Sequence, residues 1–191
     1  MTPDAALSGY DVSRETIERL SHYAALIEKW NPAINLVAKS TLPSIWHRHI
    51  ADSLQVASYL QPEQRKWVDL GSGGGLPGLV VAIVAMESCP ELQLELVEVD
   101  QRKSVFLRQV IRELGLNAQV HTAKIETLSP QGADVLSARA LAPLTALCAF
   151  AQRHSKPGGV CLFSKGAQAE EEILEAKKHW SFRLEQATSK T

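Results

Sequence analysis

The stretch WVDLGSGGGLPG, from Trp67 to Gly78, is the most informative part of this sequence. Five of its twelve residues are glycine, and it follows a polar loop and opens onto an apolar run. A backbone with so few side chains is needed where a ligand or another segment approaches it closely. The question is therefore what lies against this loop.

From Trp67 onward, the sequence alternates between apolar strand patterns and helical patterns. We expect strands at 67–70, 92–99, 118–122, 133–138 and 159–165, helices at 76–87, 102–115, 141–154 and 167–180, and a last strand at 181–188. This alternation predicts a doubly wound α/β fold, a parallel sheet with helices on both faces. Ligands of such sheets bind at the carboxyl ends of the strands, where the glycine loop lies.

Residues 1–62 are expected to form an N-terminal helical extension packed on a sheet domain of residues 63–191. Ser13 can cap a first helix, whose apolar residues recur at three- and four-residue spacing. We expect Asn31-Pro32 to end that helix, and a second helix to run from about Pro43 to Leu60.

Three nucleotide-binding templates compete for the glycine loop. A phosphate-binding P-loop ends in Gly-Lys-Ser/Thr, and this loop has no lysine. The dinucleotide template G-x-G-x-x-G is matched by Gly73, Gly75 and Gly78, which leaves an NAD-binding oxidoreductase as an alternative. The template D-x-G-x-G-x-G is matched by Asp69, Gly71, Gly73 and Gly75, and it is typical of Rossmann-like methyltransferases that use S-adenosyl-L-methionine (AdoMet).

AdoMet has no pyrophosphate, and its amino-acid end and sulfonium lie close to the loop, so the backbone there must be bare. Asp69 is expected to orient the loop or the ammonium of the cofactor. The next strand should end in an acid that accepts hydrogen bonds from both ribose hydroxyls, and Glu98 has that position. The alternative for the loop is a purely structural turn, and the alternatives to Glu98 are the nearby acids Glu95 and Asp100, expected at the surface.

The composition is that of an ordinary globular domain, with 45% apolar and 21% charged residues. We find no transmembrane run and no secretory signal, and the three cysteines form neither a zinc pattern nor a disulfide framework. We therefore expect a cytoplasmic monomer without a metal ion. The net charge of −1 argues against coating of nucleic acid by bulk charge, although it allows a local basic patch.

Several motifs occur together in one order along the chain. They are NPAINLVA (31–38), RHIADSL (48–54), DLGSGGGLPG (69–78), FLRQV (106–110), SARA (137–140) and SKG (164–166). In this combination the sequence closely resembles the bacterial RsmG (GidB) family, whose members methylate N7 of a guanine in small-subunit (16S) ribosomal RNA. The resemblance extends from about Ser13 to Gly166 and implies the same reaction, with 16S ribosomal RNA or a small-subunit particle as the substrate.

The AdoMet contacts of that family carry over to five positions of this sequence. They are Gly71 and Leu76 in the loop, the pair Ile125 and Glu126 after the third strand, and Arg139 after the fourth. The Ile125-Glu126 pair is implied to hold the adenine, mainly through backbone groups.

Two departures from the family pattern stand out. Lys124 occupies a position that is commonly arginine, so charge is kept but bidentate hydrogen bonding is lost. Family members usually continue with another strand beyond the position of Thr191. Truncation of this chain at its C-terminus is therefore one interpretation.

Methylation at guanine N7 needs alignment more than it needs a base, because N7 already carries a lone pair. The segment after the fourth strand, SARALAPL, lacks the Asn/Asp-Pro-Pro-aromatic motif of amino-group methylation. Arg139 is the candidate catalytic residue, because there it can bind the AdoMet carboxylate, guanine O6 or an RNA phosphate. The alternative for Arg139 is a surface arginine that caps the next helix.

Candidate RNA contacts are Lys124, Lys165, Arg102 and Lys103. His49 and Asp52 lie three residues apart on one helix face, and we expect a structural link to the sheet domain or, as the alternative, a place at the substrate entrance. Other functions that stay open are methylation of another RNA or of a small molecule, NAD-dependent oxidation, and non-catalytic RNA binding.

Overall fold

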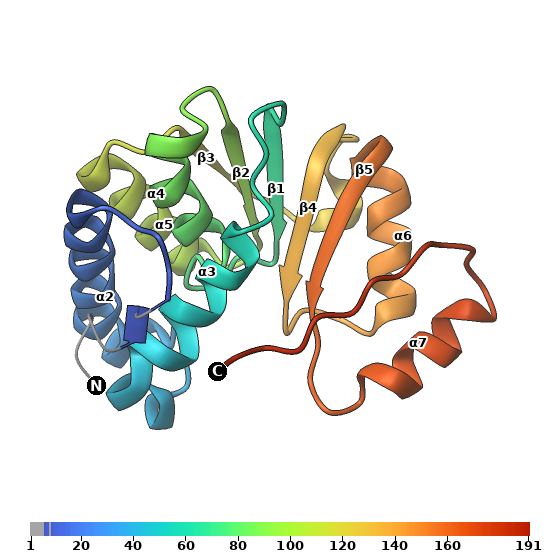
Figure 1. The fold of residues 1–191 in the computed structure, drawn as a ribbon, viewed down its shortest axis with the longest axis horizontal. Helices are drawn as coiled ribbons and strands as arrows, with labels where there is room; N and C mark the ends of the chain where they lie inside the picture. The colour runs from blue at the N-terminus through green and yellow to red at the C-terminus, as the bar shows by residue number, and fades with distance from the viewer. Residues whose placement is uncertain (1–5, 8) are drawn as a thin grey trace.

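A five-stranded parallel sheet forms the centre of the protein (Figure 1). The computed structural model describes residues 6–7 and 9–191. The strands are β1 (Lys66–Leu70), β2 (Gln93–Glu98), β3 (Ala118–Thr122), β4 (Ala133–Arg139) and β5 (Ser155–Ser164). Their order is β3-β2-β1-β4-β5, so the direction of winding reverses at β1, as the doubly wound prediction requires.

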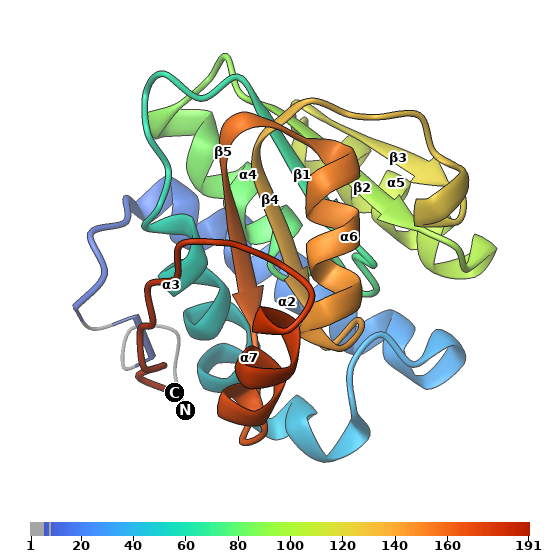
Figure 2. The same ribbon diagram turned by 90° about the vertical axis from the view of Figure 1, so that its right-hand side faces the viewer.

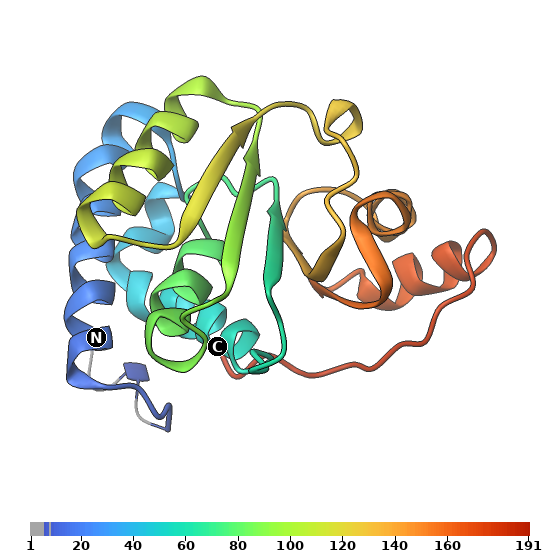
Figure 3. The ribbon, with the colours of Figure 1, turned by 90° about the horizontal axis from the view of Figure 1, so that it is seen from above.

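Helices cover both faces of the sheet, and a view from above separates the two layers (Figure 3). One layer contains α2 (Arg14–Ile34), α3 (Asp52–Ala57), α4 (Gly78–Ser88) and α5 (Gln101–Leu114), and the other contains α6 (Leu144–His154) and α7 (Ala169–Lys177). Residues of β1 alternate between two apolar clusters: Trp67 packs with the first layer and Val68 with the second. This alternation follows from the two-residue period of a strand.

The N-terminal segment differs from the prediction in two ways. Helix α2 continues through Pro32 and ends at Asn35, whose backbone is left-handed with φ 47°. The side chain of Asn31 accepts a hydrogen bond from the Val37 amide (2.8 Å), which ties the chain after α2 back onto the last turn of the helix. The expected second helix consists of three parts, the 3₁₀ helix η1 (Lys39–Ser44), the π-helix η2 (Trp46–Ala51) and α3.

The end of the chain also differs from the prediction, because residues 181–188 form no strand. The tail instead runs back past β5 to α3 (Figure 2). There the Lys190 amide donates to Gln55 Oε1 (2.8 Å), so a side chain of α3 takes the place of a strand partner. Strand β5 begins at Ser155 rather than Gly159. It can contain Pro157, because β5 is an edge strand and a proline without an amide hydrogen is tolerated on its unpaired side.

Candidate functional site

The glycine loop follows β1 directly, and its backbone takes conformations that favour glycine. Gly71 has φ 64° and Gly73 has φ 56°. A Cβ atom on Gly71 would lie 2.5 Å from Leu141 Cδ1, so a side chain there would collide with the loop that follows β4. The Ser72 amide donates to the Val97 carbonyl (3.0 Å), which attaches the loop to the neighbouring strand. The bare backbone is therefore held in one place.

Glu98 lies at the end of β2 and is 7% exposed. Its Oε2 accepts a hydrogen bond from the Gly73 amide (2.7 Å), and its Oε1 accepts one from the Asp100 amide (2.8 Å). Each carboxylate oxygen has a second lone pair, so the group can still accept from a ligand. Glu98, the acid that the sequence predicted at this strand end, is thus bonded to the glycine loop.

Asp69 lies beneath the loop and is fully buried. Its Oδ1 accepts from Ser137 Oγ (2.6 Å), and Ser137 Oγ in turn accepts from Trp67 Nε1 (2.9 Å). Burial raises the pKa of Asp69 to about 6, although the Ser137 hydrogen bond and the Arg139 charge act in the opposite direction. Within the described residues, Oδ2 has no hydrogen-bond partner.

A cleft of about 780 Å³ opens above the loop, and we call it the glycine-loop cleft. Its walls come from the ends of four strands, which is where ligands of such sheets bind. Of the predicted cofactor residues, it is lined by Gly71, Gly73, Leu76, Glu98, Ile125, Glu126 and Arg139. Asp69 and Gly75 are not part of this lining. The structure therefore brings most of the predicted set together around one space of ligand size.

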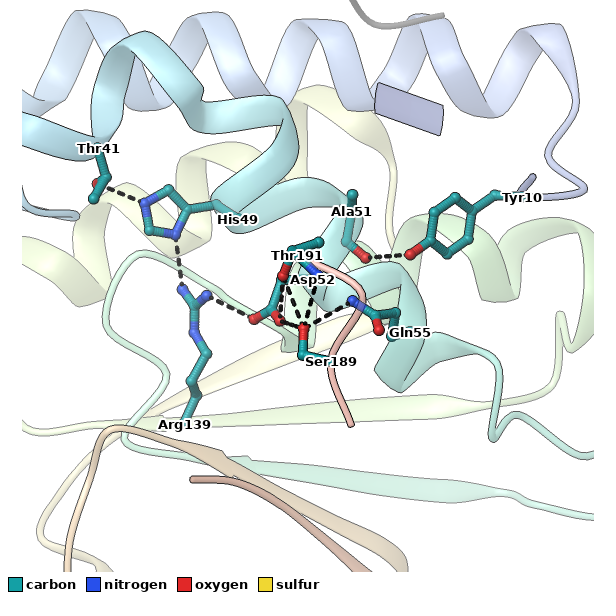
Figure 4. A network of polar contacts seen from close by, with 9 residues as sticks. All are labelled: Tyr10, Thr41, His49, Ala51, Asp52, Gln55, Arg139, Ser189 and Thr191. Atoms are coloured by element: carbon teal, nitrogen blue, oxygen red, sulfur yellow. Dashed lines mark hydrogen bonds and ion pairs between the residues drawn. The ribbon is translucent and has the colours of Figure 1, made fainter. Parts of the chain in front are cut away.

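Arg139 projects from the end of β4 toward the N-terminal helices (Figure 4). Its Nη1 lies 3.4 Å from Asp52 Oδ2, and its Nη2 donates to His49 Nδ1 (3.3 Å). The next residue, Ala140, has φ 50°, a conformation that costs energy for any residue with a Cβ. Arg139 is thus held by side chains from the N-terminal segment.

A second cleft, of about 1130 Å³, lies on the other side of Arg139. Its lining includes Asp52 and Gln55 from α3, Lys165 after β5, and Ser189 and Lys190 from the tail. Arg139, Ala140 and Leu141 border both clefts. These three residues form a common wall of the two clefts.

The candidate RNA-binding residues fall into two groups. Lys103 and Lys124 border the glycine-loop cleft, and the side chain of Arg102 is 71% exposed beside Asp100. Lys165 is engaged within the fold, because its Nζ donates to the Ala142 carbonyl (2.9 Å) and pairs with Glu172 Oε2 (2.6 Å). The ammonium of Lys165 is therefore less available to a phosphate than the sequence suggested.

Comparison with known proteins adds the family. The family model described as rRNA small subunit methyltransferase G (GidB) matches residues 16–191. The chain belongs to this family. A Ribosomal RNA small subunit methyltransferase G from Cereibacter sphaeroides is 52% identical over all of this chain and 93% of its own length. One from Ruegeria pomeroyi is 53% identical over all of this chain and 92% of its own.

Solved structures support the fold. A protein from Corynebacterium glutamicum has a TM-score of 0.58 at 11% identity and covers 92% of this chain and 83% of its own. The Precorrin-6y C5,15-methyltransferase from Geobacter metallireducens has a TM-score of 0.52 at 15% identity and covers 76% of this chain and 74% of its own. The GidB chain thus has a Rossmann-like methyltransferase fold.

Several residues that shape the two clefts in this GidB-family chain were not selected from the sequence. Leu36, Val99 and Leu141 line the glycine-loop cleft, and Ser137 supports Asp69 beneath it. Leu36 and Ser137 lie in the motifs NPAINLVA and SARA, which indicated the family but gave no role to either side chain. The spacing of His49 and Asp52 was the available signal, and it indicated a shared face but not the contact with Arg139.

Residues 6–7 and 9–191 contain neither a membrane-spanning helix nor a cluster of metal-binding side chains. No helix in this part of the chain is long and apolar enough to cross a membrane. The same residues contain no group of three His, Cys, Asp or Glu side chains that could hold a metal ion.

Proposed function

We propose that the protein transfers a methyl group from AdoMet to N7 of a guanine in small-subunit (16S) ribosomal RNA. The observation that supports this most directly is the glycine-loop cleft. In a member of the GidB family, one cleft gathers the loop, the acid after β2, the Ile125-Glu126 pair and Arg139. The curated relatives are named as methyltransferases of small-subunit ribosomal RNA, which supports an RNA substrate.

The residues of the cleft fit AdoMet. The loop presents backbone without side chains at Gly71, Gly73 and Gly74, and added Cβ atoms on two of these would meet Leu141 and Leu36. Glu98 offers a carboxylate at the rim of the loop. A volume of about 780 Å³ is in the range of small-molecule sites.

Each part of the cleft has a role in this proposal. Glu98 accepts hydrogen bonds from the ribose hydroxyls, and backbone groups of Ile125 and Glu126 hold the adenine. Gly71 and Gly73 let the amino-acid end lie against the loop, and Leu76 packs beside it. Asp69 and Gly75 act from behind the cleft by holding the loop in shape. Bound AdoMet supplies a methyl carbon that is electrophilic because it is attached to a sulfonium.

The chain has to align the acceptor and exclude water rather than remove a proton, because guanine N7 already has its lone pair. We assign the guanine to the second cleft, with Arg139 in the common wall. From there its guanidinium can donate to guanine O6 or to the carboxylate of AdoMet. It must leave N7 free, since a hydrogen bond to N7 would occupy the attacking lone pair.

Binding of RNA is assigned to the rim of the clefts. Lys103 and Lys124 line the glycine-loop cleft and are assigned to phosphate contacts, with the exposed Arg102 next to Lys103 in the chain. Lys165 has a mainly structural role. We further propose that the protein acts as a cytoplasmic monomer on the small ribosomal subunit or a precursor particle. In this view residues 1–62 and 63–191 form one working unit, since α2 packs against α4 and α5.

The test is methyl transfer to RNA of defined origin. Small subunits and free 16S ribosomal RNA from cells that lack the gene are incubated with the purified protein and isotopically labelled AdoMet. Nucleosides are then separated by mass. We expect label in 7-methylguanosine, with particle and free RNA compared in parallel. Label in another nucleoside, or none with either RNA while a related enzyme methylates the same preparation, would refute the proposal.

A further inference from the structure

The guanidinium of Arg139 is held at two points by the N-terminal segment. Asp52 lies against Nη1 (3.4 Å) and His49 against Nη2 (3.3 Å). Figure 4 shows both side chains pointing down from the helical segment toward the arginine, which rises from the end of β4. A long side chain at a strand end would otherwise sample several rotamers, so two contacts restrict it to one direction.

The contacts of His49 define which of its nitrogens carries the proton. A guanidinium only donates hydrogen bonds, so Nδ1 of His49 is the acceptor for Arg139. The other nitrogen, Nε2, lies 2.7 Å from Thr41 Oγ1 and must carry the proton. Thr41 Oγ1 in turn donates to the Ala38 carbonyl (2.7 Å). The chain from Arg139 to Ala38 therefore has one consistent direction.

Burial and the neighbouring arginines keep His49 neutral. Burial, and next the Arg139 charge, lower the pKa of His49 to about 4. Arg48 acts in the same direction, and Asp52 acts against them. A neutral imidazole can accept from a guanidinium, whereas a protonated one would place two cations together.

Asp52 alone does not define the orientation of Arg139. Its Oδ1 accepts from Ser189 Oγ (3.1 Å) and Thr191 Oγ1 (3.2 Å), so the carboxylate is shared with the tail. His49 fixes the second nitrogen of the guanidinium and hence the plane of the group. His49 belongs to the π-helix η2, an irregular element that is frequent at functional sites.

We propose that His49 is a positioning residue for methyl transfer: oriented by Thr41, its Nδ1 holds the Arg139 guanidinium in the common wall of the two clefts. This inference rests on the proposed function, in which Arg139 contacts the guanine or the cofactor. It assigns the Thr41–His49 pair to the orientation of that arginine rather than to contact with the substrate.

Two substitutions test the roles of the two His49 nitrogens separately. His49→Asn places an amide oxygen near the position of Nδ1 and keeps an acceptor for Arg139. His49→Gln places an amide nitrogen near Nε2 and keeps only the donor toward Thr41. We expect His49→Gln to lower kcat/KM for RNA by about 10-fold or more, mainly through kcat, and His49→Asn to stay within about threefold. The kcat/KM of Thr41→Val should lie between those of the two His49 variants. Thr41→Ser, which keeps the hydroxyl, should have the activity of the wild type.

The matched control is His47→Asn, two residues earlier in η2, because His47 makes no hydrogen bond to Arg139 in the part of the chain that the structure describes. It should leave kcat/KM unchanged. Equal activity of His49→Gln and His49→Asn would overturn the proposal. So would a loss in His49→Gln that disappears when activity is expressed per folded molecule.

The contact can also be tested without methyl transfer. Thermal unfolding of His49→Gln, Arg139→Gln and the double variant measures whether the two residues are coupled. We expect the shifts of the midpoint to be non-additive. Additive shifts would overturn the positioning role even in an active enzyme. An inactive wild type with coupled shifts would instead refute the proposed function and leave the contact established.

Discussion

At the scale of single residues, Asp69 has the most unusual surroundings. It is fully buried, one of its oxygens has no hydrogen-bond partner among the described residues, and burial raises its pKa to about 6. The unfolded chain has the ordinary value, 3.8. Between these values the folded state binds more protons than the unfolded state, so the contribution of Asp69 to stability falls as the pH rises.

Asp69→Asn should remove this dependence, since an amide does not titrate. The free energy of unfolding of the wild type minus that of Asp69→Asn is expected to fall by on the order of 2 kcal/mol between pH 4 and pH 7. Urea unfolding of both proteins at several pH values measures the difference. A constant difference would show that Asp69 titrates normally in the folded protein.

Gly71 and Gly115 have the same φ of 64°, so substitutions at the two positions distinguish the effect of backbone strain from the loss of AdoMet binding. Gly71→Ala adds a Cβ that meets Leu141, whereas Gly115→Ala adds one with no neighbour within 4 Å. Gly115→Ala should lower the free energy of unfolding by about 1 kcal/mol, because alanine is strained at positive φ. Gly71→Ala should lower it further, because its Cβ also has to displace Leu141. Only Gly71→Ala should abolish AdoMet binding in calorimetry. Equal loss in both variants would point to global unfolding as the cause.

At the scale of elements, the carboxylate of Glu172 adds a polar link to the apolar packing of α6 against α7. Glu172 Oε2 of α7 accepts from the Leu144 amide at the start of α6 (2.7 Å) and pairs with Lys165 after β5. The first amides of a helix have no partner within the helix, so Glu172 supplies one from outside. This contact fixes the end of β5, which borders the second cleft.

Glu172→Ala should therefore lower the free energy of unfolding by about 1 kcal/mol, because it leaves an amide and an ammonium without their partner. The control is Glu171→Ala, an exposed neighbour on the same helix, which should change it by less than about 0.5 kcal/mol. Chemical denaturation of the three proteins decides the comparison. Similar effects of both substitutions would contradict a specific role of Glu172.

At the scale of the whole molecule, the N-terminal segment and the sheet meet at Arg139. The two clefts share this residue, and its partners come from a segment about ninety positions earlier in the chain. A change at Arg139 should thus affect the reaction much more than the fold, since its contacts are at 3.3–3.4 Å and partly exposed.

Arg139→Ala should reduce kcat on the order of 100-fold. The free energy of unfolding should change by less than about 1 kcal/mol, as for other partly exposed pairs. Methyl transfer and urea unfolding of the same preparation measure both. Turnover like that of the wild type would exclude Arg139 from the reacting centre, and a large loss of stability would make it mainly a structural link.

The strands, the helices after β1 and the glycine loop were predictable from the sequence. Their signals are local, because apolar period, turn residues and a bare loop depend on neighbours in the chain. The predictions for Pro32 and for residues 181–188 were wrong for the same reason. The chain after α2 is tied back to the helix by the bond from the Val37 amide to Asn31 Oδ1, and the tail bonds to Gln55 instead of pairing as a strand.

The sequence by itself determined the order of elements, the doubly wound sheet and, through its motifs, the family. Only the tertiary structure decided which side chains meet at the clefts. His49 and Asp52 reach Arg139 because α2 and α3 pack against α4, which follows β1. Trp67, Ser137 and Asp69 meet because β1 and β4 are in register. Such contacts depend on packing between distant segments, and a local pattern of residues does not contain that information.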